Sequence, residues 1–384
     1  MNKSLKLIIV SMVLIFISCE KTDLTQGETN TVASKINPSN PVSIAYTDVK
    51  AWNINNGLPN TCSKNILVFP SWTRYNQVID YLDQQTEIYC DAFDAQWGNL
   101  PDEEYDAKCD SLGFDEDNKL LQLENNFAFC SLRKKLNTLE DAWLDVQGDG
   151  DWNANEDPDN HFIDDDTERA LLNEGVEVII GPTDTKRTQY ILYKFNADGS
   201  YYTIALTTYS ATNNTIVNTG AISALQQINN GTYVAGSNTD VTLILKIDTP
   251  PAPDCEDSNA FRQYFSTSSN TKIKAVDKYS HITMVSDPKV KAKTISYKKK
   301  NNGGWKKKRA WITAQLVTVS GIQCGSGLMP TPEEKTKRRK KVKVKWDGSD
   351  LQSLNPGMVD DATFGIHKRE SVTYNVDLFN GQAQ

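Results

Sequence analysis

The spacing of apolar residues changes from a helical to a strand period near residue 176, and this change constrains the fold more than any other feature. Ahead of it, Ser71 can cap a helix. The apolar side chains of that helix share one face, namely Trp72, Tyr75, Val78, Ile79 and Leu82. Further helices are expected over 87–97, 102–112 and 118–146. The last carries an apolar seam that predicts packing against a partner, made of Leu132, Leu136, Leu139, Trp143 and Val146.

Beyond this point, short runs rich in β-branched and aromatic residues predict strands at 176–180, 189–195, 201–209 and 241–247. The turn residues at 196–200 predict a hairpin between two of them. A short buried strand is also expected at 66–69, just before the first helix.

From residue 289 on, charged or polar residues alternate with apolar ones over 289–299, 305–319, 341–346 and 371–379. This alternation predicts an antiparallel sandwich or barrel with one face toward water. We therefore expect an α+β protein. An acidic, mostly helical domain (41–250) with a β-hairpin extension precedes a basic antiparallel β-sandwich-like domain (255–384), and the proline-rich stretch 249–253 divides them.

Residues 1–19 have the order of a bacterial export signal. Lys3 and Lys6 precede the apolar run Leu7–Ile17, which would form about 16 Å of helix and is too short to cross a membrane. Residues 16–19 then resemble a lipoprotein signal in which Cys19 is the first mature residue and carries the acyl chains. An ordinary secretory signal (1–18) with a chance cysteine is the alternative. We expect a polar tether at 19–40, and a lipid-anchored cell-envelope protein at the outer membrane, facing the periplasm or the cell surface.

Without Cys19, six of the seven cysteines remain, and an even number in an exported chain predicts up to three disulfides. Cys255 and Cys324 lie apart from the others, so we expect them to pair. Cys109 and Cys130 fall on the apolar faces of neighbouring predicted helices, where a bridge could join them. Pairing in the N-terminal half stays open, and unpaired buried thiols are the alternative.

The net charge of −8 conceals a strong division along the chain. Residues 20–271 hold 39 acidic against 16 basic residues, and residues 272–345 hold 21 basic against 4 acidic. Such asymmetry steers partners more than the total charge does.

The candidate anion-binding residues of this basic region are Lys306, Lys307, Lys308, Arg309, Lys337, Arg338 and Arg339. Behind an export signal we do not expect nucleic acid, and we expect an anionic envelope polymer or glycan. Two other readings compete. Lysines on edge strands discourage aggregation, and the basic domain can simply dock on the acidic one.

An acidic loop provides the most specific local signal. Asp145, Gln147, Asp149, Asp151 and Glu156 follow the spacing of an EF-hand calcium loop, with Gly150 at the sharp turn and with glutamine in place of a charged ligand. No exit helix is expected, since Pro158 follows. The sequence predicts a weak structural calcium site, and a solvated acidic turn is the alternative.

Three tryptophans are interleaved with the basic stretches, namely Trp305, Trp311 and Trp346. If exposed they would form a stacking platform for sugars, and if buried they are sheet core. The sequence has no G-x-S-x-G, H-E-x-x-H or P-loop motif. We therefore expect a binding or interaction module rather than an enzyme. A carbohydrate-active hydrolase and a structural subunit of an outer-membrane complex are the alternatives.

Several of these segments together resemble uncharacterised cell-envelope lipoproteins of Bacteroidota-type bacteria. They are the strand at 66–69 with its Ser71-capped helix, then Leu171-Leu172-Asn173 and 177–181 ahead of a β domain. The resemblance implies a lipid-anchored location in the envelope and no assigned activity.

Overall fold

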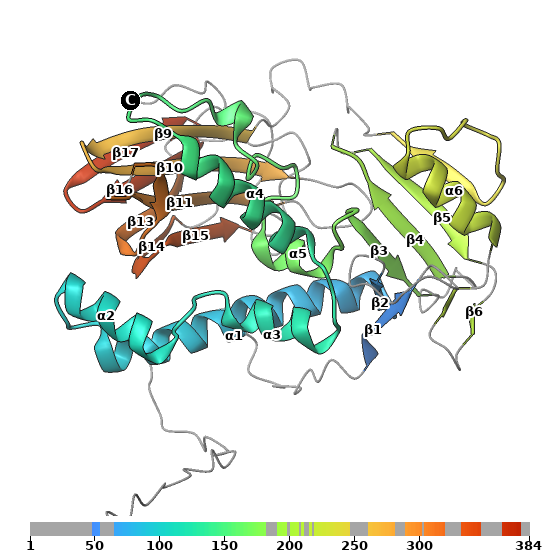
Figure 1. Cartoon of the computed structure of the whole chain (residues 1–384), viewed down its shortest axis with the longest axis horizontal. Helices are drawn as coiled ribbons and strands as arrows, with labels where there is room; N and C mark the ends of the chain where they lie inside the picture. Colours follow the sequence, from blue (N-terminus) through green and yellow to red (C-terminus); the bar gives the residue numbers. More distant parts are fainter. Residues whose placement is uncertain are drawn as a thin grey trace, which may run out of the picture. The chain divides into compact units, whose positions relative to one another are not determined.

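The structure is a computed structural model that describes residues 48–53, 65–181, 190–197, 200–206, 209–210, 215–216, 219–245, 260–280, 289–301, 303–318, 332–346 and 363–377 (Figure 1). All of these residues belong to one compact unit, Ile44–Gln384. The expected signal and tether, the break at 249–253, Cys19 and the Cys255–Cys324 pair lie outside the described residues.

The helices of the described part are α1 (Trp72–Trp97), α2 (Asp102–Leu112), α3 (Asn118–Asn126), α4 (Leu132–Val146), α5 (Asp166–Leu171), α6 (Thr219–Asn229) and the short 3-10 helix η3 (Ala154–Glu156). Ser71 caps α1 as predicted, because its Oγ accepts the backbone N–H of Arg74 at 3.1 Å. The helix expected at 87–97 is the second half of α1, which runs for 26 residues without a break.

The stretch 118–146 contains two helices rather than the single one expected. The chain leaves α3 through Ala128, which has φ 45°, and Ser131 then caps α4. The predicted seam of α4 is wrong at two of its five positions, because Leu139 and Val146 are exposed. The buried face of α4 instead follows a spacing of four residues through Leu132, Leu136, Glu140 and Leu144. The apolar pattern of the sequence does not reveal this face, because a glutamate occupies one core position.

An eight-stranded sheet has the order β6-β7-β1-β2-β3-β4-β5-β8. Its strands are β1 (Lys50–Asn53), β2 (Asn65–Phe69), β3 (Glu177–Ile180), β4 (Tyr190–Phe195), β5 (Tyr201–Leu206), β6 (Tyr209–Ser210), β7 (Thr215–Ile216) and β8 (Val241–Ile244). Strands β2 and β3 are parallel, and β4 and β5 form the hairpin predicted around 196–200.

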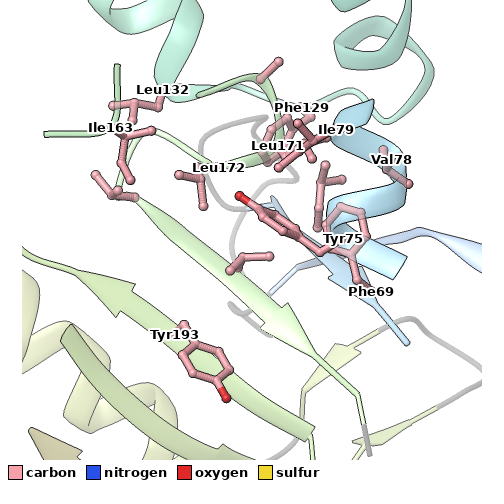
Figure 2. Packing of buried hydrophobic residues seen from close by; sticks show 14 of the residues in the cluster. Phe69, Tyr75, Val78, Ile79, Phe129, Leu132, Ile163, Leu171, Leu172 and Tyr193 are labelled. Carbon is pink, nitrogen blue, oxygen red and sulfur yellow. The ribbon is translucent and has the colours of Figure 1, made fainter. Parts of the chain in front are cut away.

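Both faces of this sheet are covered, which explains the uninterrupted apolar run of β2. Leu67 and Phe69 point to a core shared with α1, α3, α4 and α5, where Figure 2 shows Phe69 beside Tyr75 of α1. Ile66 and Val68 alternate with them and pack toward α6 on the opposite face. A sheet buried on both faces has no polar side to alternate with the apolar one.

Two further sheets build the C-terminal part. A five-stranded sheet comprises β9 (Ala260–Ser268), β10 (Thr271–Ser280), β11 (Lys289–Lys299), β12 (Trp305–Lys307) and β15 (Lys341–Trp346). A four-stranded sheet comprises β13 (Ala310–Thr318), β14 (Glu333–Arg339), β16 (Thr363–Arg369) and β17 (Val372–Asp377). The strands pair antiparallel, and apolar side chains of β11, β13 and β15 meet in one cluster. The predicted α+β class with an antiparallel sandwich is confirmed.

The expectation of one face toward water is wrong for the five-stranded sheet. Five lysines of its strands β10 and β11 are buried, namely Lys272, Lys274, Lys278, Lys291 and Lys293. Their amines contact residues 150–164 of the acidic half of the chain. Alternation along a strand indicates which residues share a face, but it does not indicate what covers that face.

Candidate functional site

Most of the predicted anion-binding residues lie in a charged interface between the acidic helices and the basic strands. Six of the seven have an acidic partner from the helical part of the chain. The pairs are Lys307–Glu140 (2.7 Å), Arg309–Glu116 (2.8 Å), Lys337–Asp91 (2.7 Å), Lys308–Asp106, Arg338–Asp102 and Arg339–Asp94. Lys306 is exposed and forms no ion pair within the described residues. The geometry therefore favours docking of the basic domain on the acidic one.

Helix α1 contributes an acidic stripe to this interface. Its residues recur at helical spacing along one face, namely Asp80, Asp83, Glu87, Asp91 and Asp94. Their partners come from β14 and β15, and the pairs include Asp83–Lys343 at 3.0 Å and Glu87–Lys335 at 2.7 Å. Each acidic residue of the α1 stripe thus contacts a basic residue of β14 or β15.

The acidic segment, residues 157–169, covers the five-stranded sheet with buried carboxylates. Asp159 lies 2.7 Å from the Lys274 amine and 3.4 Å from that of Lys293, and it also pairs with Arg169. Burial alone would raise the pKa of Asp159, but these cations outweigh burial and hold that pKa well below its usual value. Burial in turn lowers the pKa of Lys278, a neighbour of Asp164, to about 8.

The predicted calcium ligands are not gathered around one point by the loop. Asp145 pairs with Lys300, Asp149 pairs with Lys299 at 2.6 Å, and Glu156 accepts a hydrogen bond from Asn153 at 3.0 Å. Gly150 lacks the positive φ of a sharp turn, and its carbonyl accepts a hydrogen bond from Lys272. Within the described residues no group of three or more metal-ligating side chains is found. Calcium binding by Asp145, Gln147, Asp149, Asp151 and Glu156 stays a prediction.

The three tryptophans have different surroundings. Trp305 and Trp346 are 1% and 2% exposed and belong to the sheet cores. Trp311 of β13 is 48% exposed. Of the three tryptophans considered as a stacking platform for sugars, only Trp311 is therefore exposed.

Trp311 stands on the outer face of the four-stranded sheet, where the strand registers place mainly polar residues. Thr313 lies between Thr336 and Lys368, and Gln315 lies between Glu334 and Ile366. Strand β17 adds Thr373 and Asn375 to the same two rows. Glu334, Thr336, Thr373 and Asn375 are exposed.

A buried polar trio crosses from one sheet of the sandwich to the other. Asp277 Oδ2 lies 3.0 Å from His367 Nε2, and His367 Nδ1 lies 2.8 Å from Thr294 Oγ1. Thr294 donates its hydroxyl proton to the Thr313 carbonyl, so it is not poised as a nucleophile. All three side chains are buried, and the trio links the sheets rather than forming a reaction centre.

Cys90 and Cys109 are free thiols in one buried aromatic cluster with Tyr105 and Phe114. Burial raises the pKa of Cys90 to about 12. The bridge considered between Cys109 and Cys130 is therefore not formed. Cys130 is disulfide-bonded, and its partner lies outside the described residues.

Comparisons with known proteins add little. No protein-family model and no curated protein matches the chain. A solved structure of a DUF4848 family protein from Bacteroides thetaiotaomicron is similar at 11% identity, covers 84% of this chain and 96% of its own, and has a TM-score of 0.17. A TM-score this low carries no argument about function. None of the described helices is long and apolar enough to cross a membrane.

Proposed function

We propose that this chain is a lipid-anchored envelope protein that binds a glycan on the outer face of its four-stranded sheet. The observation that carries the proposal is Trp311, a large aromatic side chain that is 48% exposed at the second position of strand β13. An exposed indole on the surface of a sheet offers a π-face to the C–H face of a sugar ring.

The surroundings of Trp311 supply the polar groups that sugar hydroxyls require. Hydroxyl and amide side chains of Thr336, Thr373, Asn375 and Gln315 share its face. On this face the Lys368 amine lies 4.0 Å from a carboxylate oxygen of Glu334, so this pair adds hydrogen-bonding groups without a net charge. Such a face fits a neutral or weakly charged glycan better than a polyanion.

The test is a glycan-binding array on the purified protein, followed by titration of the best ligand with Trp311→Ala. We expect at least a tenfold loss of affinity, about 1.4 kcal/mol, because the stacking surface disappears. Leu139→Ala is the matched control, since Leu139 is 47% exposed on α4, away from this sheet. Equal affinity of Trp311→Ala and the parent protein would remove the proposal.

The envelope location rests on acylation of Cys19 and has its own test. Cys19→Ala should move the protein from the membrane fraction to the soluble fraction, because acyl chains are the proposed anchor. Immunoblots of fractionated cells measure this, and Cys90→Ala serves as the control that keeps the proposed anchor. Equal membrane association of Cys19→Ala and the parent would contradict the anchor.

A further inference from the structure

Lys274 of β10 and Asp157 of the acidic segment form an ion pair unlike the others in the charged interface. Both side chains are 0% exposed, a combination found in no other ion pair of the described residues. Lys343 provides a contrast. It contacts two carboxylates, Asp83 and Asp165, in the same way, but its side chain is 30% exposed and remains hydrated.

The atoms around this pair are arranged as for acyl transfer to an amine. The Lys274 amine and the Tyr264 hydroxyl both contact Asp157 Oδ2, and the backbone N–H of Asp159 donates to Asp157 Oδ1 at 2.9 Å. A second carboxylate, that of Asp159, lies 2.7 Å from the same amine. Tyr264 packs on Trp152 with ring centroids 4.9 Å apart, and Tyr297 lies next to it, so aromatic rings surround the site.

We propose that Lys274 and Asp157 condense into an intramolecular isopeptide bond that covalently links the acidic segment to the basic sheet. The Lys274 ammonium gives one proton to Asp159, and its lone pair then attacks Cγ of Asp157. Oδ1 stays as the amide oxygen, held by the Asp159 N–H. Oδ2 takes the proton from Asp159 and a second proton from the attacking nitrogen, and it leaves as water.

This step needs no oxidant, reductant or added reactant. An ammonium and a carboxylate become one amide and one water, and Asp159 ends as the carboxylate that it was at the start. Fixing the two groups in contact replaces an encounter in solution, and effective molarities of about 10⁵–10⁸ M are known for such arrangements. The amide also replaces two buried charges, whose desolvation is costly.

Two influences oppose the transfer of a proton from Lys274 to Asp159. Burial lowers the pKa of Lys274, but Asp159 and Asp157 outweigh burial and raise it, so the amine starts protonated. The cations around Asp159 also hold its pKa below the usual value, so this transfer is the uphill part of the step. The proton must still move before attack, and the Asp159 carboxylate lies 2.7 Å from the amine. We accordingly assign Asp159 the role of proton carrier.

Tryptic peptide mapping of the reduced, denatured full-length protein tests the proposal. An isopeptide bond blocks cleavage after Lys274 and joins peptide 136–169 to peptide 273–278, with the mass of their sum minus one water. We expect this branched peptide in the parent protein and in Lys343→Arg, the matched control at a hydrated lysine.

Asp159→Asn should yield linear peptides while its circular dichroism spectrum still shows a folded chain. If the folded parent protein yields only the linear peptides, no bond forms and the proposal is overturned. A branched peptide of undiminished yield in Asp159→Asn would overturn the role given to Asp159.

Discussion

At the scale of single residues, Gly365 of β16 shows how closely the two sheets of the sandwich approach. A Cβ at this position would lie 1.9 Å from Asp277 Oδ1. Asp277 has little freedom to move aside, because His367 holds its other oxygen at 3.0 Å. Glycine is required here because a side chain would not fit between the sheets. Its backbone conformation does not require glycine, since its φ is not in the left-handed region.

Gly365→Ala should therefore destabilise the protein. We expect the free energy of unfolding to fall by about 1–3 kcal/mol, the usual cost of overpacking a core. Urea titration followed by tryptophan fluorescence measures it. Gly148→Ala is the control, because a Cβ there meets no atom within 4 Å. Similar stability of the two variants would mean that the sheets separate easily at Gly365.

At the scale of secondary-structure elements, the acidic stripe of α1 offers an internal comparison between buried and exposed ion pairs. Asp83 is largely buried and contacts Lys343, Lys345 and the Thr167 hydroxyl. Glu87 lies one turn further along, is more exposed, and contacts Lys335. Both carboxylates pair with lysines of the basic strands, but Asp83 is less exposed to water than Glu87.

Asp83→Ala should lower the free energy of unfolding by about 1–3 kcal/mol, because it removes the carboxylate that pairs with two lysines and leaves the buried Thr167 hydroxyl without its acceptor. Glu87→Ala should cost less than about 1 kcal/mol, as exposed ion pairs do. Thermal and urea denaturation of both variants measure the difference. Equal losses would show that the stripe acts through total charge rather than through particular buried contacts.

The sequence allowed the elements to be predicted better than their contacts. The strands at 289–299 and 341–346 are found at those bounds, and the cap at Ser71 is confirmed. The acidic residues of the α1 stripe recur at helical spacing, but that spacing does not indicate what they contact. Their partners follow more than 200 residues later, and no local pattern indicates which distant strand will cover a given face. The same limit separates Trp311, which is exposed, from Trp305 and Trp346, which alternate with lysines in a similar way.

At the scale of the whole chain, the acidic and basic halves neutralise each other. Six aspartates of the charged interface have lowered pKa values, namely Asp83, Asp117, Asp159, Asp164, Asp165 and Asp166. Burial works to raise these pKa values, and lysines and arginines of the interface outweigh it. Burial prevails at Glu116, Glu140 and Asp277, whose pKa values are raised. The folded state thus has more carboxyl groups that resist protonation than groups that favour it.

Acid should consequently unfold this protein. A carboxyl group whose pKa is lower in the folded state stabilises that state above its unfolded pKa of about 3.9, and this contribution is lost as the pH falls toward the folded pKa. We expect the free energy of unfolding to drop by more than about 2 kcal/mol between pH 6 and pH 3, measured by urea titration. Added salt should alter the drop little, because buried pairs are weakly screened.

A pair of variants tests whether the buried carboxylates cause this dependence on pH. Asp164→Asn should be less stable at pH 7 by about 3–5 kcal/mol, because it leaves the buried Lys278 and Lys291 amines without their carboxylate. Its stability should then fall less steeply with acid than that of the parent protein. Asp145→Asn removes an exposed carboxylate, and its pH dependence should match that of the parent. If the stability of both variants falls with acid as steeply as that of the parent protein, the acid sensitivity arises outside the buried carboxylates. The ion pairs of the charged interface would then not hold the two halves together in the way that their contacts imply.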